Sequence, residues 1–268
     1  LALPISQSGE TADTLAALRL AKKTGHRCVS IVNAVGSAVA RESDYVIYEG
    51  AGPEIAVATT KGYTTQVALL ATVAVKLALE KGRIDGTAAR ELCRALSRDV
   101  PDAISDIIAR RGEIAERAKM RKDSEDIYFI GRGPDWPACS ECSLKLKEIS
   151  YIHSEAYAAG ELKHGTLSLI EDGTPVIALA SDGGYYDKMC GNIREVRSRG
   201  GFVILVCGED FDEPEKFSDA HFVLPKTERY FTPLATVVFS QLLAYETALL
   251  RGCDVDHPRN LAKSVTVE

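Results

Sequence analysis

The sequence predicts an α/β fold, in which two units each hold a doubly wound parallel sheet between layers of helices. Apolar strand-like runs alternate with amphipathic helical segments, which is the pattern of βαβ units. The pattern occurs twice, because segments 175 positions apart, such as those ending in Ser6 and Ser181, resemble one another. The length of 268 residues also suits about two domains, at roughly 100–200 residues each.

The repeat is clearest when Ser6 is aligned with Ser181, since both serines end a short apolar run. The same offset then aligns a second apolar strand, a segment that begins Ser-Asp and the start of a long helix. These pairs are 28–32 with 203–207, 43–47 with 218–222, and 65–70 with 240–245. One offset therefore holds through four segments without a gap.

The first copy predicts a strand, a helix, two further strands and a long helix, over 3–6, 11–23, 28–32, 43–47 and from about Lys61. The first helix interleaves leucines with charges, and Gly25 stands where a glycine ends a helix. The continuous apolar run 28–32 is typical of a strand buried on both faces of a parallel sheet. The most apolar stretch, Val67–Leu79, is expected to form a buried helix.

The second copy opens with material that the first copy lacks. It predicts a strand over 127–130, a Gly-Arg-Gly turn and helical material through Leu167, and these positions minus 175 are negative. We therefore expect the chain to begin inside its first domain, as a piece of a longer protein. The expected parts are an N-terminally incomplete first domain over 1–92, a complete second domain over 93–252 and a tail over 253–268.

The segment between the copies is rich in charge and alanine. It predicts helices over 88–97 and 101–121, the second with Pro101 in its first turn. After the linker, the expected elements of the second copy are a strand ending at Ser181, a helix over 185–199 and a strand over 202–207.

Composition and charge exclude several classes of protein. A net charge of −6 and a pI near 5.5 argue against nucleic-acid binding, which requires a basic face. We expect no membrane span and no signal peptide, because no run of about 18 uncharged apolar residues and no basic leader occurs. Seven scattered cysteines predict a reduced, cytoplasmic protein. Cys139 and Cys142 have CxxC spacing but no second ligand pair, so we expect no metal or redox site.

The run Ser6-Gln7-Ser8-Gly9-Glu10-Thr11 follows a strand and opens a helix. At that edge of a doubly wound sheet, its hydroxyls and free amide groups favour a phosphate site. The alternative is a plain helix cap made by Thr11. In the second copy Asp182 would repel an anion, so we expect one phosphate site. Thr59 and Thr60 either add hydroxyl donors to it or cap the helix that follows.

The densest polar region runs from Glu141 to His164. Glu141, Lys145 and Glu148 have i,i+3, i,i+4 and i,i+7 spacings, so all three can line one wall of a cleft. Taken alone, these spacings are more typical of a solvated, salt-bridged helix face. A lone loop histidine such as His164 is more often a surface residue than a catalyst.

Three segments together closely resemble the glucosamine-6-phosphate synthase family, the isomerising glutamine:fructose-6-phosphate aminotransferases. These segments are SQSGET, KLKEISYIHSEAYAAGELKHG and the terminal PRNLAKSVTVE. The resemblance covers essentially the whole chain and points to the sugar-isomerase half of that family, which consists of two SIS domains. SQSGET is shared by many sugar-phosphate SIS proteins, whereas the KLKEISYIH segment and the tail are more specific.

The resemblance implies a set of site residues. The sugar phosphate would be bound by Ser6, Gln7, Ser8, Thr11 and Thr59, with backbone contacts from Val57 and Ala262.

It also implies the catalytic groups. Glu148 would move a proton between C1 and C2 of the sugar, with Lys145 assisting at that centre and Glu141 positioning the groups. His164, donated by the neighbouring subunit of a homodimer, would open the sugar ring. Lys263 in the tail would form a Schiff base with the open-chain ketose. No metal or organic cofactor is implied, and ammonia would come from a glutaminase domain that this sequence lacks.

The sequence departs from the family at several positions. Thr59 stands where the family usually has serine, Thr166 replaces a proline and His257 replaces a glutamine. The family's opening strand, which carries a further phosphate-binding turn, lies in the part that the repeat indicates to be missing. Two alternatives stay open: an SIS fructosamine-phosphate deglycase, which need not keep a C-terminal lysine, and a non-catalytic sugar-phosphate sensor, which would lose the catalytic groups.

Overall fold

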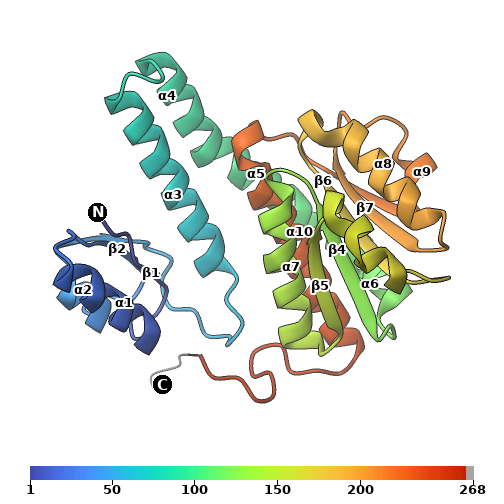
Figure 1. Cartoon of the computed structure of the whole chain (residues 1–268), viewed down its shortest axis with the longest axis horizontal. Helices are drawn as coiled ribbons and strands as arrows, with labels where there is room; N and C mark the ends of the chain where they lie inside the picture. The colour runs from blue at the N-terminus through green and yellow to red at the C-terminus, as the bar shows by residue number, and fades with distance from the viewer. Residues whose placement is uncertain (264–268) are drawn as a thin grey trace. The chain divides into compact units, whose positions relative to one another are not determined.

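The computed structural model describes residues 1–263 and divides into two compact units. Unit 1 holds Leu1–Glu80 together with the tail from Asp256, and unit 2 holds Lys81–Val255. Each unit contains one sheet whose strands are all parallel, with helices packed against it (Figure 1). The predicted α/β class with parallel sheets is therefore confirmed.

Unit 1 has a three-stranded sheet in the order β1-β2-β3. Its elements are β1 (Ile5–Ser6), α1 (Ala12–Lys23), β2 (Val29–Val32), α2 (Ala38–Glu42), β3 (Tyr45–Tyr48) and α3 (Lys61–Glu80). The strand β1 is shorter than the expected run 3–6, because Pro4 has no N–H group to give to a ladder. A small core of Leu18, Cys28, Val32 and Val39 joins α1 and α2 to the sheet.

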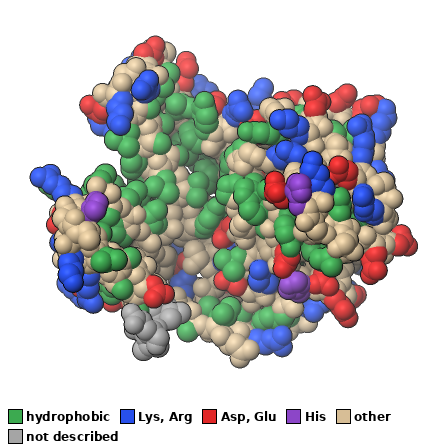
Figure 2. All heavy atoms as spheres, in the orientation of Figure 1, with side chains coloured by type: hydrophobic (Ala, Val, Ile, Leu, Met, Phe, Trp, Pro, Cys, Tyr) green, Lys and Arg blue, Asp and Glu red, His purple; other side chains and the backbone are tan. Residues whose placement is uncertain are grey.

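The expectation of a buried helix over Val67–Leu79 is wrong in this structure. The helix α3 forms, but Gly62 is its only buried residue, and Figure 2 shows hydrophobic side chains on the surface over this helix. Its counterpart in unit 2, α10 (Thr232–Leu250), is largely buried. Both helices are long and apolar enough to pass a length-and-composition test for membrane spans, which a core helix of an α/β domain also passes.

Unit 2 has a five-stranded sheet in the order β5-β4-β6-β7-β8. It begins with α4 (Gly86–Arg94), the π-helical turn η1 (Ala95–Asp99), α5 (Val100–Ala109) and α6 (Arg111–Arg121). The sheet region follows as β4 (Asp126–Gly131), α7 (Asp135–Ser150), β5 (His153–Ala158), η2 (Ala159–His164), η3 (Thr166–Leu169), β6 (Pro175–Ala180), η4 (Gly183–Tyr185), α8 (Tyr186–Arg197), β7 (Phe202–Gly208), α9 (Pro214–Phe217), β8 (Ala220–Leu224), η5 (Arg229–Phe231) and then α10.

Two elements of unit 2 differ from the sequence prediction. The single helix expected over 101–121 is two helices, because the chain leaves helical geometry at Arg110. The segment 153–158, expected to be helical, is the edge strand β5. An edge strand packs few apolar side chains, so its sequence lacks the continuous apolar pattern of the inner strands.

The two units share one plan, as the repeat predicts. The strands β1, β2 and β3 correspond to β6, β7 and β8, and α3 corresponds to α10. In unit 2 the helices α5, α6 and α7 pack against α10. Among residues 1–263, unit 1 holds no counterpart of these helices or of β4 and β5, which explains why α3 is exposed where α10 is covered.

Candidate functional site

The loop after β1 has a fixed shape that depends on a glycine. The Ser6 hydroxyl oxygen accepts from the Gly9 amide at 2.9 Å, and the Ser8 hydroxyl oxygen accepts from the Glu10 amide at 3.3 Å. Gly9 has a φ of 66°, and a β-carbon there would lie 2.0 Å from the Ser37 hydroxyl oxygen. No other residue type fits this position without moving the loop.

Thr11 precedes α1 but does not cap it. Its side chain makes no capping hydrogen bond to the helix. The alternative of a plain threonine cap is therefore wrong, and the first amides of α1 and the Thr11 hydroxyl are left for another acceptor or donor. The positive end of the helix dipole and these groups suit a bound anion.

The start of α3 is capped by a residue that sequence reasoning missed. The Glu54 Oε1 atom accepts from the amides of Thr60 and Gly62, at 2.8 and 3.2 Å. Glu54 therefore takes part in capping this helix, from six residues upstream of Thr60. No local capping motif marks Glu54, because it reaches the helix across a loop.

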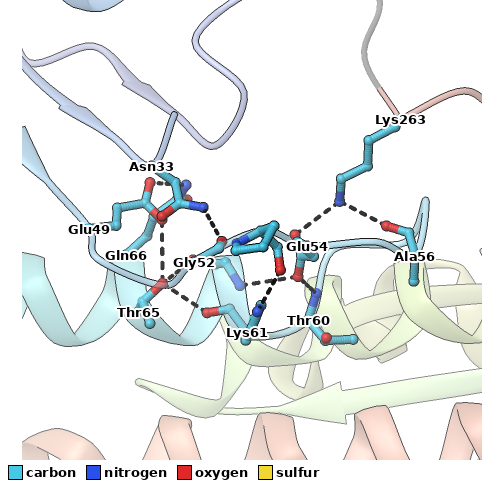
Figure 3. A network of polar contacts seen from close by, with 12 residues as sticks. Asn33, Glu49, Gly52, Glu54, Ala56, Thr60, Lys61, Thr65, Gln66 and Lys263 are labelled. Atoms are coloured by element: carbon cyan, nitrogen blue, oxygen red, sulfur yellow. Dashed lines mark hydrogen bonds and ion pairs between the residues drawn. The ribbon is translucent and has the colours of Figure 1, made fainter. Parts of the chain in front are cut away.

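The tail lysine contacts this same loop. Lys263 Nζ lies 3.0 Å from Glu54 Oε2 and donates to the Ala56 carbonyl at 2.8 Å (Figure 3). The Val57 amide donates to the Asp256 carbonyl at 2.9 Å, which holds the tail to the loop a second time. The Val57 amide is thus already used by the tail.

Several predicted residues of unit 1 meet around Gly62. A β-carbon at Gly62 would lie 3.0 Å from Thr59 Cγ2, 3.1 Å from Gln7 Cγ and 3.1 Å from Glu54 Oε2. The SQSGET loop, the Thr59 loop and the carboxylate that holds Lys263 are therefore neighbours. Ala262, beside Lys263 in the tail, is exposed.

In unit 2 the three predicted charged residues of α7 form a cluster. Lys145 Nζ lies 2.5 Å from Glu148 Oε2 and 3.5 Å from Glu141 Oε1. The side chains of Lys145, Glu141 and Glu148 are 5%, 11% and 21% exposed. The interpretation as a solvated helix face is therefore wrong, since buried charges of this kind persist only when they are paired.

The other predicted residues of unit 2 are a loop histidine and the two cysteines of the CxxC segment. His164 is exposed at the end of η2, and within residues 1–263 no hydrogen bond or ion pair joins it to α7. Cys139 and Cys142 are fully buried on α7, and burial raises the pKa of the Cys142 thiol to about 12. A buried thiol with a raised pKa is a poor nucleophile.

The loop after β6 is the unit 2 counterpart of SQSGET, and it has a different chemistry. Asp182 Oδ1 accepts from the Gly184 amide at 2.9 Å, and Oδ2 lies 3.1 Å from Arg229 Nε. A carboxylate therefore stands where unit 1 offers hydroxyl groups. The cavity of about 620 Å³ at this edge is lined by acids and bases together, namely Asp182, Glu209, Asp210, Glu228, Lys226 and Arg229.

The chain is similar in sequence to known proteins over most of its length. The SIS domain family matches residues 1–76 and 120–251. The whole chain is 51% identical to part of the isomerising glutamine–fructose-6-phosphate aminotransferase of Caldanaerobacter subterraneus subsp. tengcongensis, and 47% identical to part of that of Methanosarcina acetivorans. The chain spans 44% and 43% of those two proteins, which is less than half of their length.

The chain is also similar to solved structures. The C-terminal domain of glucosamine-fructose-6-phosphate aminotransferase from Francisella tularensis matches with a TM-score of 0.91 and 37% identity, over 96% of this chain and 73% of that one. A glucosamine-6-phosphate deaminase from Thermotoga maritima matches with a TM-score of 0.78 and 26% identity, over 98% of this chain and 74% of that one.

Proposed function

The chain belongs to the SIS domain family, and on that premise we propose that it is the sugar-isomerase part of an isomerising glutamine–fructose-6-phosphate aminotransferase. It would bind fructose 6-phosphate and, with ammonia from a glutaminase domain, form glucosamine 6-phosphate. The observation that carries the proposal is the position of Lys263, which the tail brings to the loop beside Gln7 and Thr59.

Phosphate binding is assigned to unit 1. The hydroxyls of Ser6, Ser8 and Thr11 and the first amides of α1 supply the donors, and Gln7 and Thr59 lie close by. Hydroxyl and amide donors at a helix N-terminus bind phosphate without net positive charge. This agrees with a chain whose net charge is −6.

Covalent chemistry is assigned to Lys263. Its amine would attack the C2 carbonyl of the open-chain ketose and form an imine with loss of water. The imine draws electrons from C1 and makes a C1 proton easier to remove. A substrate anchored by its phosphate presents that carbonyl in a fixed geometry.

Proton transfer is assigned to the α7 cluster. Glu148 would act as the general base that moves a proton between C1 and C2. Lys145, at 2.5 Å from it, would stabilise the carboxylate and the oxygen that gains charge, and Glu141 would hold Lys145 in place. His164 would open the sugar ring of a neighbouring subunit, which suits its exposure in one chain.

The Schiff base is tested by reduction. The complete natural protein is treated with fructose 6-phosphate and borohydride, and the masses of its tryptic peptides are measured by mass spectrometry. We expect a hexitol phosphate adduct on Lys263 and none in Lys263→Arg. A wild-type protein without the adduct would refute the Schiff-base assignment and favour the sensor or the deglycase.

The base is tested separately. We expect Glu148→Gln to abolish exchange of the C1 proton with deuterated solvent while fructose 6-phosphate still binds. Exchange at the wild-type rate would reject Glu148 as the base.

The proposed function also includes a homodimer, a glutaminase domain as partner and a cytoplasmic location.

A further inference from the structure

Glu54 is a buried carboxylate whose two oxygen atoms have different partners. Its side chain is 4% exposed. Oε1 accepts from two backbone amides, those of Thr60 and Gly62, while Oε2 lies 3.0 Å from Lys263 Nζ (Figure 3). The two amides fix the plane of the carboxylate, so that Oε2 faces the lysine.

The lysine side chain is oriented as well. Lys263 is only 28% exposed, and its second contact is the Ala56 carbonyl at 2.8 Å. A carbonyl cannot accept a proton permanently, whereas a carboxylate can. Of the two groups that hold the ammonium, Glu54 is therefore the one able to convert it into a nucleophilic amine.

We propose that Glu54 is a further catalytic residue, which accepts and returns the protons of Lys263 during Schiff-base formation. The proposal rests on the function proposed above, because it assigns a role within the reaction of Lys263 with a ketose.

In the proposed reaction, Glu54 mediates each proton transfer. It takes one proton from the ammonium of Lys263, and the free amine attacks C2 while the C=O electron pair moves to oxygen. Glu54 gives its proton to that oxygen and takes another from the attached nitrogen. It then protonates the hydroxyl, which leaves as water as the C=N bond forms. The net change is ammonium plus carbonyl to iminium plus water, and Glu54 ends as a carboxylate.

The surroundings favour an ionised Glu54 in the free protein. Burial acts to raise its pKa, but hydrogen bonds from Thr60, Lys263 and Gly62 outweigh burial and hold the pKa below its ordinary value. Two more charged residues belong to the same network (Figure 3): Glu49, which contacts Thr65 and Gln66, and Lys61, which donates to the Pro53 carbonyl at 2.7 Å.

The carboxylate becomes a better base during the reaction. When the ammonium gives up its charge, Glu54 loses one of the contacts that lower its pKa, while its burial persists. Glu54 Oε2, which contacts the amine, lies with Gln7 and Thr59 around Gly62. The proton is therefore removed next to the loops assigned to the phosphate.

The test is Glu54→Gln in the complete natural protein. Glutamine keeps the length and an oxygen for the Thr60 and Gly62 amides but cannot take a proton. Trapping of fructose 6-phosphate by borohydride is measured from pH 7 to pH 9, and the ratio of wild-type to variant rate cancels the pH dependence of the reductant. We expect a ratio above about 10 at pH 7 that falls by up to tenfold per pH unit, because the variant amine must lose its proton to water.

Two controls separate this role from a structural one. Glu54→Asp keeps a carboxylate at a longer distance, so we expect slower trapping with the wild-type pH profile. Glu49→Gln removes a neighbouring acid that contacts Thr65 and Gln66, and we expect no change in the profile.

The outcomes are distinct. A wild-type adduct with the same rate ratio at every pH, or with a ratio of one, overturns the role of Glu54 and leaves the proposed function intact. No adduct on wild-type Lys263 overturns the proposed function together with this inference. A ratio that falls with pH supports both.

Discussion

Replacing Lys145 by methionine tests whether the α7 cluster is a buried charge network. Methionine keeps most of the apolar stem of the side chain and removes the ammonium. Glu141 and Glu148 then lose the cation that lies 3.5 and 2.5 Å from them. Because their side chains are only 11% and 21% exposed, water replaces that cation poorly.

The expected cost is about 3 kcal/mol in the free energy of unfolding. Removing one partner of a buried ion pair costs roughly 3–5 kcal/mol, and the partial exposure of Glu148 favours the lower end. In Lys145→Met/Glu148→Gln, more than half of the lost stability should return.

The assay is urea unfolding followed by tryptophan fluorescence. The only tryptophan of the sequence, Trp136, lies in the first turn of α7, so its signal reports the unit that holds the cluster. A loss below about 1 kcal/mol would refute the reasoning, since that is the behaviour of an exposed ion pair.

Three further predictions concern single positions. Gly9→Ala should cost more than about 1–2 kcal/mol and weaken phosphate binding, measured by thermal shift with inorganic phosphate, because its φ is 66° and the added carbon meets Ser37. Burial raises the pKa of Asp135 from 3.8 to about 6, so its contribution to stability is greatest below pH 4 and is lost as the pH rises through 6. Asp135→Asn should remove that loss, and its unfolding free energy relative to wild type should rise by about 2 kcal/mol from pH 4 to pH 7. Iodoacetamide should label exposed Cys93 in the native protein and leave buried Cys142 unmodified, as peptide masses would show. Equal labelling of both would contradict this.

The sequence alone determined the fold class, the repeat and the order of most elements. These depend on local patterns: the apolar run that becomes β2, the amphipathic helix α1, and Gly25. Gly25 comes directly after the end of α1 and has a φ of 80°. The SQSGET loop was recognisable for the same reason, since its hydroxyls are adjacent in the chain. The edge strand β5 and the break at Arg110 were missed, because neither has a strong local signal.

Only the tertiary structure decided which charges are buried and which groups meet. The spacing of Glu141, Lys145 and Glu148 is the same on a solvated and on a buried helix face, and packing makes the difference. Glu54 and Lys263 are 209 positions apart, so no local pattern relates them. The tail places the lysine on the loop, and the amides of Thr60 and Gly62 orient the carboxylate towards it. A proton-transfer pair of this kind arises from chain topology, which periodicity and motifs along the sequence do not encode.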